Sequence, residues 1–176
     1  LRGKGQLLGW ISLLRAAPCE WVMTSEDTVL LGVPAKIFVS CAENNSGFFE
    51  ALSGMRNFHE LDVVLQQMAA ADARLASGWQ EKLYALGESD RTWTASIKAG
   101  VPFTPPEAVP SGVVWLLSTE GVPGMAVGRV IQEGDILPIR TGFNLPYRLV
   151  AVDSENVIQP NKSQQDIGSG DSIQPY

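Results

Sequence analysis

The longest regular pattern of apolar positions in the chain runs through residues 57–87. The apolar stripe consists of Leu61, Val64, Met68, Ala71, Leu75, Trp79, Leu83 and Leu86. Successive members are three or four positions apart, which keeps them on one face of an α-helix. Asn57 and Glu60 match a capping box at the start, and Gly87 suits the C-terminal cap. The sequence therefore predicts one long amphipathic helix over residues 58–86, about 44 Å in length.

A helix of this length is compatible with two arrangements. Its stripe can pack on a sheet as a core helix, with Gly78 as a weak point, or it can form the seam of a self-associating coiled coil. The stripe contains neither a polar Asn nor the contrast between Ile and Leu positions that selects an oligomer. The pattern leaves both arrangements, and the number of chains in an oligomer, open.

Residues 1–56 predict a short helix followed by a small β-meander. Leu7, Leu8, Ile11 and Leu14 share one helical face, and the helix is expected to end at Pro18. Residues 20–24, 28–32 and 36–42 are strand-like, with polar or Gly-Pro turns between them. A short turn of helix around residues 48–52 ends this zone.

The C-terminal half predicts a second β-rich unit. Residues 88–111 contain four prolines and are expected to form a semi-rigid connector. The strand-like runs 113–118, 126–131, 136–140 and 147–152 predict an antiparallel β-module over residues 112–153, with Gly134 and Asp135 defining a turn. Residues 154–176 are polar and predict an extended tail. The predicted fold class is α+β, divided into residues 1–56, 57–87, 88–111, 112–153 and 154–176.

Composition narrows the classes of partner. The chain is 45% hydrophobic and 18% charged, so it can bury a core. Its net charge of −6 opposes binding to a phosphate backbone, and no cluster of Lys and Arg offsets that charge locally. The apolar run at residues 7–14 is far shorter than the roughly 20 residues that a membrane span requires. We therefore expect no nucleic-acid partner and no membrane insertion.

The sequence offers little for catalysis. His59 is the only histidine, which removes a Ser-His-acid triad and the usual zinc spacings. Glu133 and Asp135 flank a glycine in a predicted turn, where such residues usually serve turn geometry. We predict no enzyme activity, no metal site and no cofactor.

Two residue types leave further questions. Cys19 and Cys41 can form a disulfide or stay free, and the sequence does not choose between the two. Trp93 follows the predicted helix in a polar stretch and is the candidate for an exposed anchor that binds a partner.

Residues 110–153 carry a resemblance to a known family. Gly112, Ser118, Gly121, Gly124, the Gly134-Asp135 pair and the aromatic Tyr147 recur in this order through the segment. The order resembles a small β-module of bacteriophage tail-fibre and related virion proteins. The usual closing tryptophan of that module is Tyr147 here, and Pro138 interrupts the strand after Gly-Asp.

The resemblance implies a non-enzymatic structural protein of a phage tail, located in the virion and contributing to host attachment. It also implies a homo-oligomer, generally a trimer, that contacts other tail proteins, with the apolar stripe as its coiled-coil seam. The motif fixes no receptor-binding residue. The alternative is a periplasmic scaffold or connector of a bacterial pilus or secretion system, because the segment is also similar to small barrel domains that dock through a strand edge.

Overall fold

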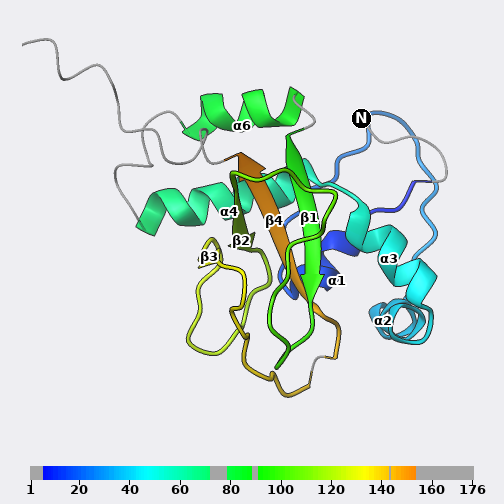
Figure 1. The fold of residues 1–176 in the computed structure, drawn as a ribbon. Coiled ribbons are helices and arrows are strands. Elements are labelled where there is room, and N and C mark those ends of the chain that lie inside the picture. Colours follow the sequence, from blue (N-terminus) through cyan, green and yellow to red (C-terminus); the bar gives the residue numbers. More distant parts are fainter. Residues whose placement is uncertain (1–5, 72–78, 89–90, 143, 154–176) are drawn as a thin grey trace, which may run out of the picture.

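The computed structural model describes residues 6–71, 79–88, 91–142 and 144–153 (Figure 1). These residues form an α+β fold of five helices and one four-stranded sheet. The helices are α1 (Trp10–Arg15), α2 (Ala35–Asn44), α3 (Ser46–Gly54), α4 (Phe58–Ala71) and α6 (Trp79–Glu88). The strands are β1 (Thr92–Ile97), β2 (Val113–Leu117), β3 (Val130–Ile131) and β4 (Tyr147–Asp153).

The sheet is antiparallel, with the strand order β1-β4-β2-β3. The last strand in the chain therefore lies in the interior, where Val150 pairs with Thr94 on one side and with Leu116 on the other. Six of the seven residues of β4 are buried. This explains why the strand reads as an almost unbroken apolar run, because an interior strand covered on both faces needs no polar side.

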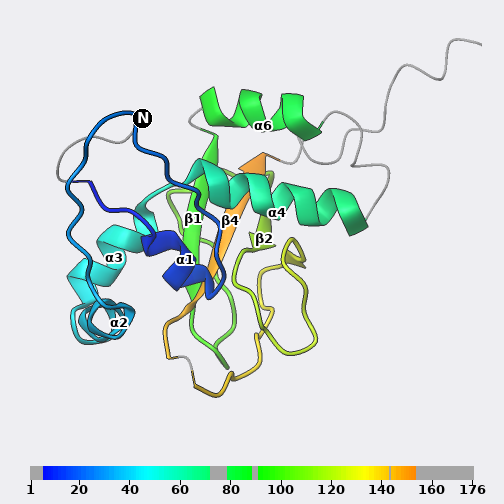
Figure 2. The same ribbon diagram turned by 180° about the vertical axis from the view of Figure 1, so that it is seen from behind.

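One face of the sheet packs against α4 and α6, which lie side by side across it (Figures 1 and 2). The buried residues of this layer are Leu61, Val64, Leu65, Met68, Leu83, Leu86, Leu116, Val150 and Val152. The opposite face is covered by connecting loops, which contribute Phe103, Val122 and Leu137. There the Phe103 and Trp115 rings meet edge to face, with centroids 5.3 Å apart.

A third apolar cluster joins the three N-terminal helices. It contains Trp10, Ile11, Leu14, Cys19, Phe38, Ala42, Leu52 and Leu145. Because Leu145 lies two positions before the start of β4, this cluster places the N-terminal helices beside one end of the central strand. Residues from α1 and β4 are consequently brought together although they are far apart in sequence.

The predicted N-terminal β-meander is wrong. Residues 36–42 lie inside α2, which follows Pro34 at its N-cap position. Its buried residues, Phe38 and Ala42, are four positions apart, as one face of a helix requires. Residues 20–24 and 28–32 form no strand, because they pair with no described neighbour. A short apolar run fits a strand and a buried helix equally well, and here tertiary packing selects the helix.

The single long helix predicted over residues 58–86 is also wrong. The structure has α4 ending at Ala71 and α6 beginning at Trp79, while residues 72–78 lie outside the described part. Both helices pack on the same face of the sheet. The apolar positions of α4 and α6 keep the same spacing because both helices bury their apolar faces in the same core. That spacing does not indicate that the two helices are separate elements.

The C-terminal half differs from the prediction in three places. The segment predicted as a connector contains β1, which pairs with β4 along its length. The strand predicted at 126–131 is reduced to Val130–Ile131, and residues 136–140 contribute only an isolated bridge between Ile136 and Pro102. The strands predicted at 113–118 and 147–152 correspond to β2 and β4. The predicted tail lies outside the described residues.

Candidate functional site

Two features stand apart from the ordinary core: a buried polar cluster and an exposed apolar arm. The polar cluster consists of Arg15, Glu60, Ser118 and Arg148. Each of these side chains is at most 1% exposed, and together they come from α1, α4, the residue after β2, and β4. Charged side chains are seldom buried this completely unless they are paired.

Glu60 is at the centre of the polar cluster. Its Oε1 accepts hydrogen bonds from Arg148 Nε at 2.7 Å and from Ser118 Oγ at 2.6 Å. The other guanidinium nitrogens of Arg148 donate to the carbonyl oxygens of Ser53 and Met55, at 2.9 and 2.6 Å. Arg148 therefore joins the central strand to α4 and to the end of α3.

Arg15 extends the polar cluster to α1. Its Nε donates to Ser118 Oγ at 2.9 Å and to Ser118 O at 3.1 Å. Three buried atoms of this region have no protein partner, namely Arg15 Nη1, Glu60 Oε2 and the neighbouring Trp10 Nε1. Two donors and one acceptor are groups that internal water satisfies. The arrangement cross-links four elements, which is a structural role.

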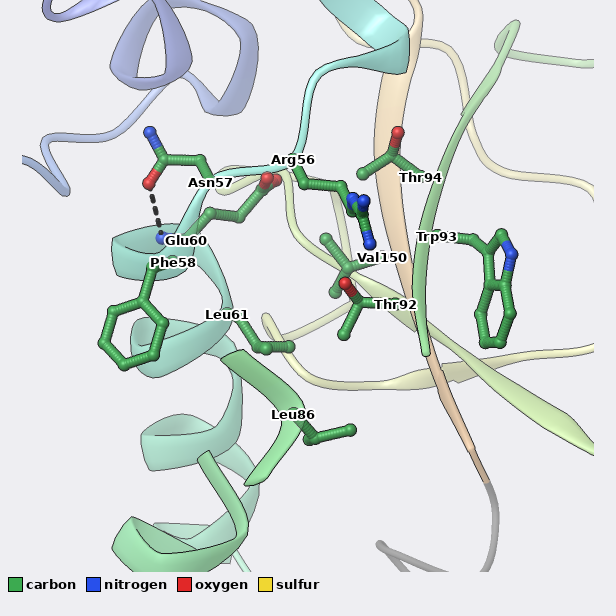
Figure 3. Close-up of a pocket in the computed structure, with 10 residues that line it drawn as sticks. All are labelled: Arg56, Asn57, Phe58, Glu60, Leu61, Leu86, Thr92, Trp93, Thr94 and Val150. Atoms are coloured by element: carbon green, nitrogen blue, oxygen red, sulfur yellow. Dashed lines mark hydrogen bonds between the residues drawn. The ribbon is translucent and has the colours of Figure 1, made fainter. Parts of the chain in front are cut away.

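A small cleft borders the polar cluster (Figure 3). Its volume is about 170 Å³, close to the roughly 150 Å³ that accommodates benzene in a protein interior. It is lined by Arg56, Asn57, Phe58, Glu60, Leu61, Leu86, Thr92, Trp93, Thr94 and Val150. Polar side chains that line the cleft already make hydrogen bonds within the fold. Thr94 Oγ1 donates to Ser53 O at 2.6 Å, and Asn57 Oδ1 accepts from the backbone N of His59 and Glu60.

The apolar arm is the segment of residues 21–33, which connects α1 to α2. Every one of its residues is exposed. The exposed fractions of its large apolar side chains are Trp21 92%, Val22 50%, Met23 94%, Val29 100%, Leu30 63%, Leu31 92% and Val33 53%. Among the described residues, no backbone–backbone hydrogen bond ties the arm to the fold. So many exposed apolar side chains within one short segment are typical of an interaction site.

Both ends of the apolar arm are held by the fold. Before the arm, the Glu20 carboxylate accepts hydrogen bonds from Gly9 N and from Asn57 Nδ2, each at 2.7 Å. After it, Pro34 is the N-cap of α2, and its carbonyl oxygen accepts from Ile37 N at 2.9 Å. The arm is therefore a loop that projects from a defined base (Figure 2, the blue segment).

The structure uses most of the predicted seam inside a single chain. Leu61, Val64, Met68, Leu83 and Leu86 are buried against the sheet. Ala71 is exposed, whereas Leu75 and the side chain of Trp79 lie outside the described part. These five buried side chains are committed to the monomer core.

The other predicted site residues are found in separate places. Gly134 has a φ of +87°, and Asp135 Oδ2 accepts from Gln132 N at 2.9 Å, so the predicted turn is built as a turn. Trp93 is half-buried on β1, and its ring points away from the cleft toward the loop-covered face (Figure 3). His59 is exposed at the start of α4. Cys19 is buried and Cys41 exposed, and both are free thiols.

Sequence reasoning missed the two main features. Single hydrogen bonds of the polar cluster join residues up to 103 positions apart, and no local pattern reports such a pairing. The apolar arm did carry a signal, because two strand-like runs flank Ser25-Glu26-Asp27. That signal was interpreted as strand pairing within the chain.

A comparison of this chain with family models, with curated proteins and with solved structures finds no match. In the described part of the chain, no helix is both long and apolar enough to cross a bilayer. The same residues contain no group of three or more His, Cys, Asp or Glu side chains placed to hold a metal ion. The geometry of the chain itself therefore supplies the evidence on function.

Proposed function

We propose that this chain is a non-enzymatic structural protein of a phage tail that assembles with further copies of itself through the apolar arm. The observation that carries the proposal is the exposure of the arm, where Met23, Val29 and Leu31 are each more than 90% exposed. In a protein that stays monomeric, such exposed apolar side chains would lower solubility without stabilising the fold.

The energetics favour an intermolecular contact. Burying a large aliphatic or aromatic side chain contributes roughly 1.5–3 kcal/mol, so seven of them supply on the order of 10–20 kcal/mol. Association costs about 4–15 kcal/mol in lost translational and rotational freedom. The favourable free energy of burying one arm is thus similar in size to the free energy that association costs. Burying a second arm in the same complex adds favourable free energy, whereas the association cost arises once.

A second copy of the chain is the occupant that best meets this requirement. A standard interface buries about 800 Å² on each partner. Where each copy both donates an arm and receives one, every copy contributes two contact areas of the size of the arm. Exchange between identical chains is therefore the simplest way to reach a stable interface.

The phage-tail part of the proposal draws on the resemblance of residues 110–153. The glycines that carry the resemblance include Gly121 and Gly134, whose φ values are +71° and +87°. These are backbone conformations that favour glycine. The pattern of glycines is thus a requirement of the loop geometry, as it would be in a module of that family. A tail protein functions inside an assembly, and such a role would account for the exposed apolar arm of this chain.

The solution mass tests the proposal. Light scattering coupled to size exclusion should give a multiple of 19.0 kDa for the full chain, with about 57 kDa for a trimer. The triple variant Trp21→Ser/Val29→Ser/Leu31→Ser should give 19.0 kDa and an unchanged circular dichroism spectrum, because these side chains touch no core.

A matched control removes apolar surface elsewhere. Tyr84, Ile136 and Ile139 are 70%, 57% and 77% exposed. The variant Tyr84→Ser/Ile136→Ser/Ile139→Ser should keep the wild-type mass. A wild-type mass of 19.0 kDa at about 100 μM protein would overturn the proposal. So would an oligomer whose mass does not depend on the arm.

A further inference from the structure

One long edge strand of the sheet has no strand paired on its outer side, although α3 packs beside it through Ser53. In the order β1-β4-β2-β3, the outermost strands are β1 with six residues and β3 with two. Within the described part of the chain, the backbone of β1 pairs only with β4. An edge strand of this length presents unpaired N–H and C=O groups that can pair with another chain. β3 is too short to offer an equivalent edge.

The apolar arm contains a segment of matching length and type. Residues 28–33 read Thr-Val-Leu-Leu-Gly-Val, a run rich in β-branched and aliphatic residues. Six residues in extended conformation span about 20 Å, as do the six residues of β1. This segment has strand-forming character but pairs with no described residue of its own chain.

The side chains of the two segments also alternate compatibly. On β1, Trp93, Ala95 and Ile97 face the loop-covered apolar cluster. Thr94 and Ser96 face the opposite way and contact Ser53 of α3. In an added strand, Val29, Leu31 and Val33 would share one face and Thr28, Leu30 and Gly32 the other. With Val29, Leu31 and Val33 on the loop-covered face, this row would continue the apolar cluster past Trp93, which is half-buried in one chain.

Charge is complementary at the same place. The arm carries Glu26 and Asp27 next to the strand-like segment, and both are exposed. β1 lies between Arg91 and Lys98, which are also exposed. Arg91 already pairs with Asp153 at 3.4 Å, but its side chain remains 63% exposed. Opposite charges at the ends of the two segments favour their approach.

We propose that residues 28–33 of the apolar arm add as a strand to the outer edge of β1 in a second copy of the chain. The inference rests on the proposed function and names the surface that receives the arm. Backbone hydrogen bonds along β1 then give affinity, while the row of Val29, Leu31 and Val33 gives register. The assembled sheet has five strands, one of them contributed by the neighbouring copy.

Hydrogen exchange measured by mass spectrometry on the full chain tests this inference. At low protein concentration, where the chain is monomeric, amides of residues 28–33 should exchange freely. At a concentration where light scattering shows the oligomer, those amides and the edge amides of β1 should both exchange at least tenfold more slowly. Residues of β4 serve as the internal control, because an interior strand is protected at both concentrations.

A variant makes the test specific. Val29→Ser/Leu31→Ser should abolish the concentration-dependent protection of β1, although β1 itself is unchanged. Protection of the arm without protection of β1 would overturn the inference and leave the proposed self-assembly in place. A chain that stays at 19.0 kDa and protects neither segment would overturn both.

Discussion

Glu60 and Arg148 form an ion pair with a 2.7 Å separation between Oε1 and Nε, and neither side chain has more than 1% of its surface exposed. The pair joins the first turn of α4 to the central strand across 88 positions of sequence. Its guanidinium also lies over the Trp10 ring, 5.5 Å from the centroid. This contact connects the helical layer, the sheet and α1.

Glu60→Leu should strongly destabilise the fold. The change leaves the Arg148 guanidinium buried without its carboxylate partner, and removing one member of a buried pair costs about 3–5 kcal/mol. Chemical denaturation followed by circular dichroism measures the free energy of unfolding. The double variant Glu60→Leu/Arg148→Met should recover much of that loss, because it removes both charges together.

The same helix supplies the control. Asp62 is partly exposed and accepts a hydrogen bond from Gln66 at 3.1 Å. Asp62→Leu should change the free energy of unfolding by about 0.5 kcal/mol or less. If the Glu60 and Asp62 variants lost equal free energy of unfolding, the buried pair of Glu60 and Arg148 would contribute no more to stability than a partly exposed contact.

Gly128→Ala should destabilise the protein more than Gly124→Ala. Both glycines have positive φ, +82° and +70°, so both variants carry about 1–2 kcal/mol of backbone strain. An added Cβ at Gly128 would also lie 2.7 Å from Met68 Cγ and 3.2 Å from Val64 O, whereas Gly124 has open space. Crowding of α4 adds about 1–3 kcal/mol. Similar unfolding midpoints for the two variants would contradict the close approach of this loop to α4.

Thiol labelling should distinguish the two cysteines. Cys41 is exposed on α2, whereas Cys19 is 8% exposed and lies 3.8 Å from Ser12 Oγ. A thiol reagent should modify one group quickly in the native protein and two in denaturant. Cys41→Ser should remove the fast phase, while Cys19→Ser should leave it unchanged. Two fast thiols, or none, would be incompatible with this arrangement.

The sequence predicted those elements whose evidence is local. The strands around Trp115 and Leu149 were recognisable because apolar runs between turn-forming glycines favour strands. The start of α4 was recognisable from Asn57 and Glu60, and Asn57 Oδ1 does accept from the Glu60 backbone N at 3.2 Å. Both features depend on residues within a few positions of one another.

The features that sequence reasoning missed are set by distant contacts. β1 was assigned to the connector because of the prolines that follow it, and its partner β4 lies 50 or more positions away, where no local pattern reports it. Glu60 was recognised only as a capping residue, since nothing near it indicates that Arg148 will arrive beside it. The apolar arm was assigned to strands because its sequence favours strands. If the proposed assembly is formed, residues 28–33 do become a strand, but one that requires a second chain.

The base of the apolar arm should contribute to assembly without touching the partner. Glu20 accepts from Gly9 N and Asn57 Nδ2, and these contacts restrict the directions in which the arm leaves the fold. Glu20→Ala removes both acceptors and leaves residues 21–33 unchanged. A less ordered arm loses more conformational freedom on binding. Self-association should therefore weaken by roughly tenfold, equivalent to about 1.4 kcal/mol.

Sedimentation over a range of protein concentrations measures this effect on the dissociation constant. Glu43 is exposed on α2, so Glu43→Ala removes a similar charge without releasing the arm and should leave the constant unchanged. If Glu20→Ala assembles as tightly as the wild type, the arm is not preorganised by its base. If Glu43→Ala weakens assembly equally, net charge rather than the position of the arm controls association. Weaker self-association of Glu20→Ala alone would show that the hydrogen bonds of Glu20 support assembly by holding the arm in the orientation in which it binds.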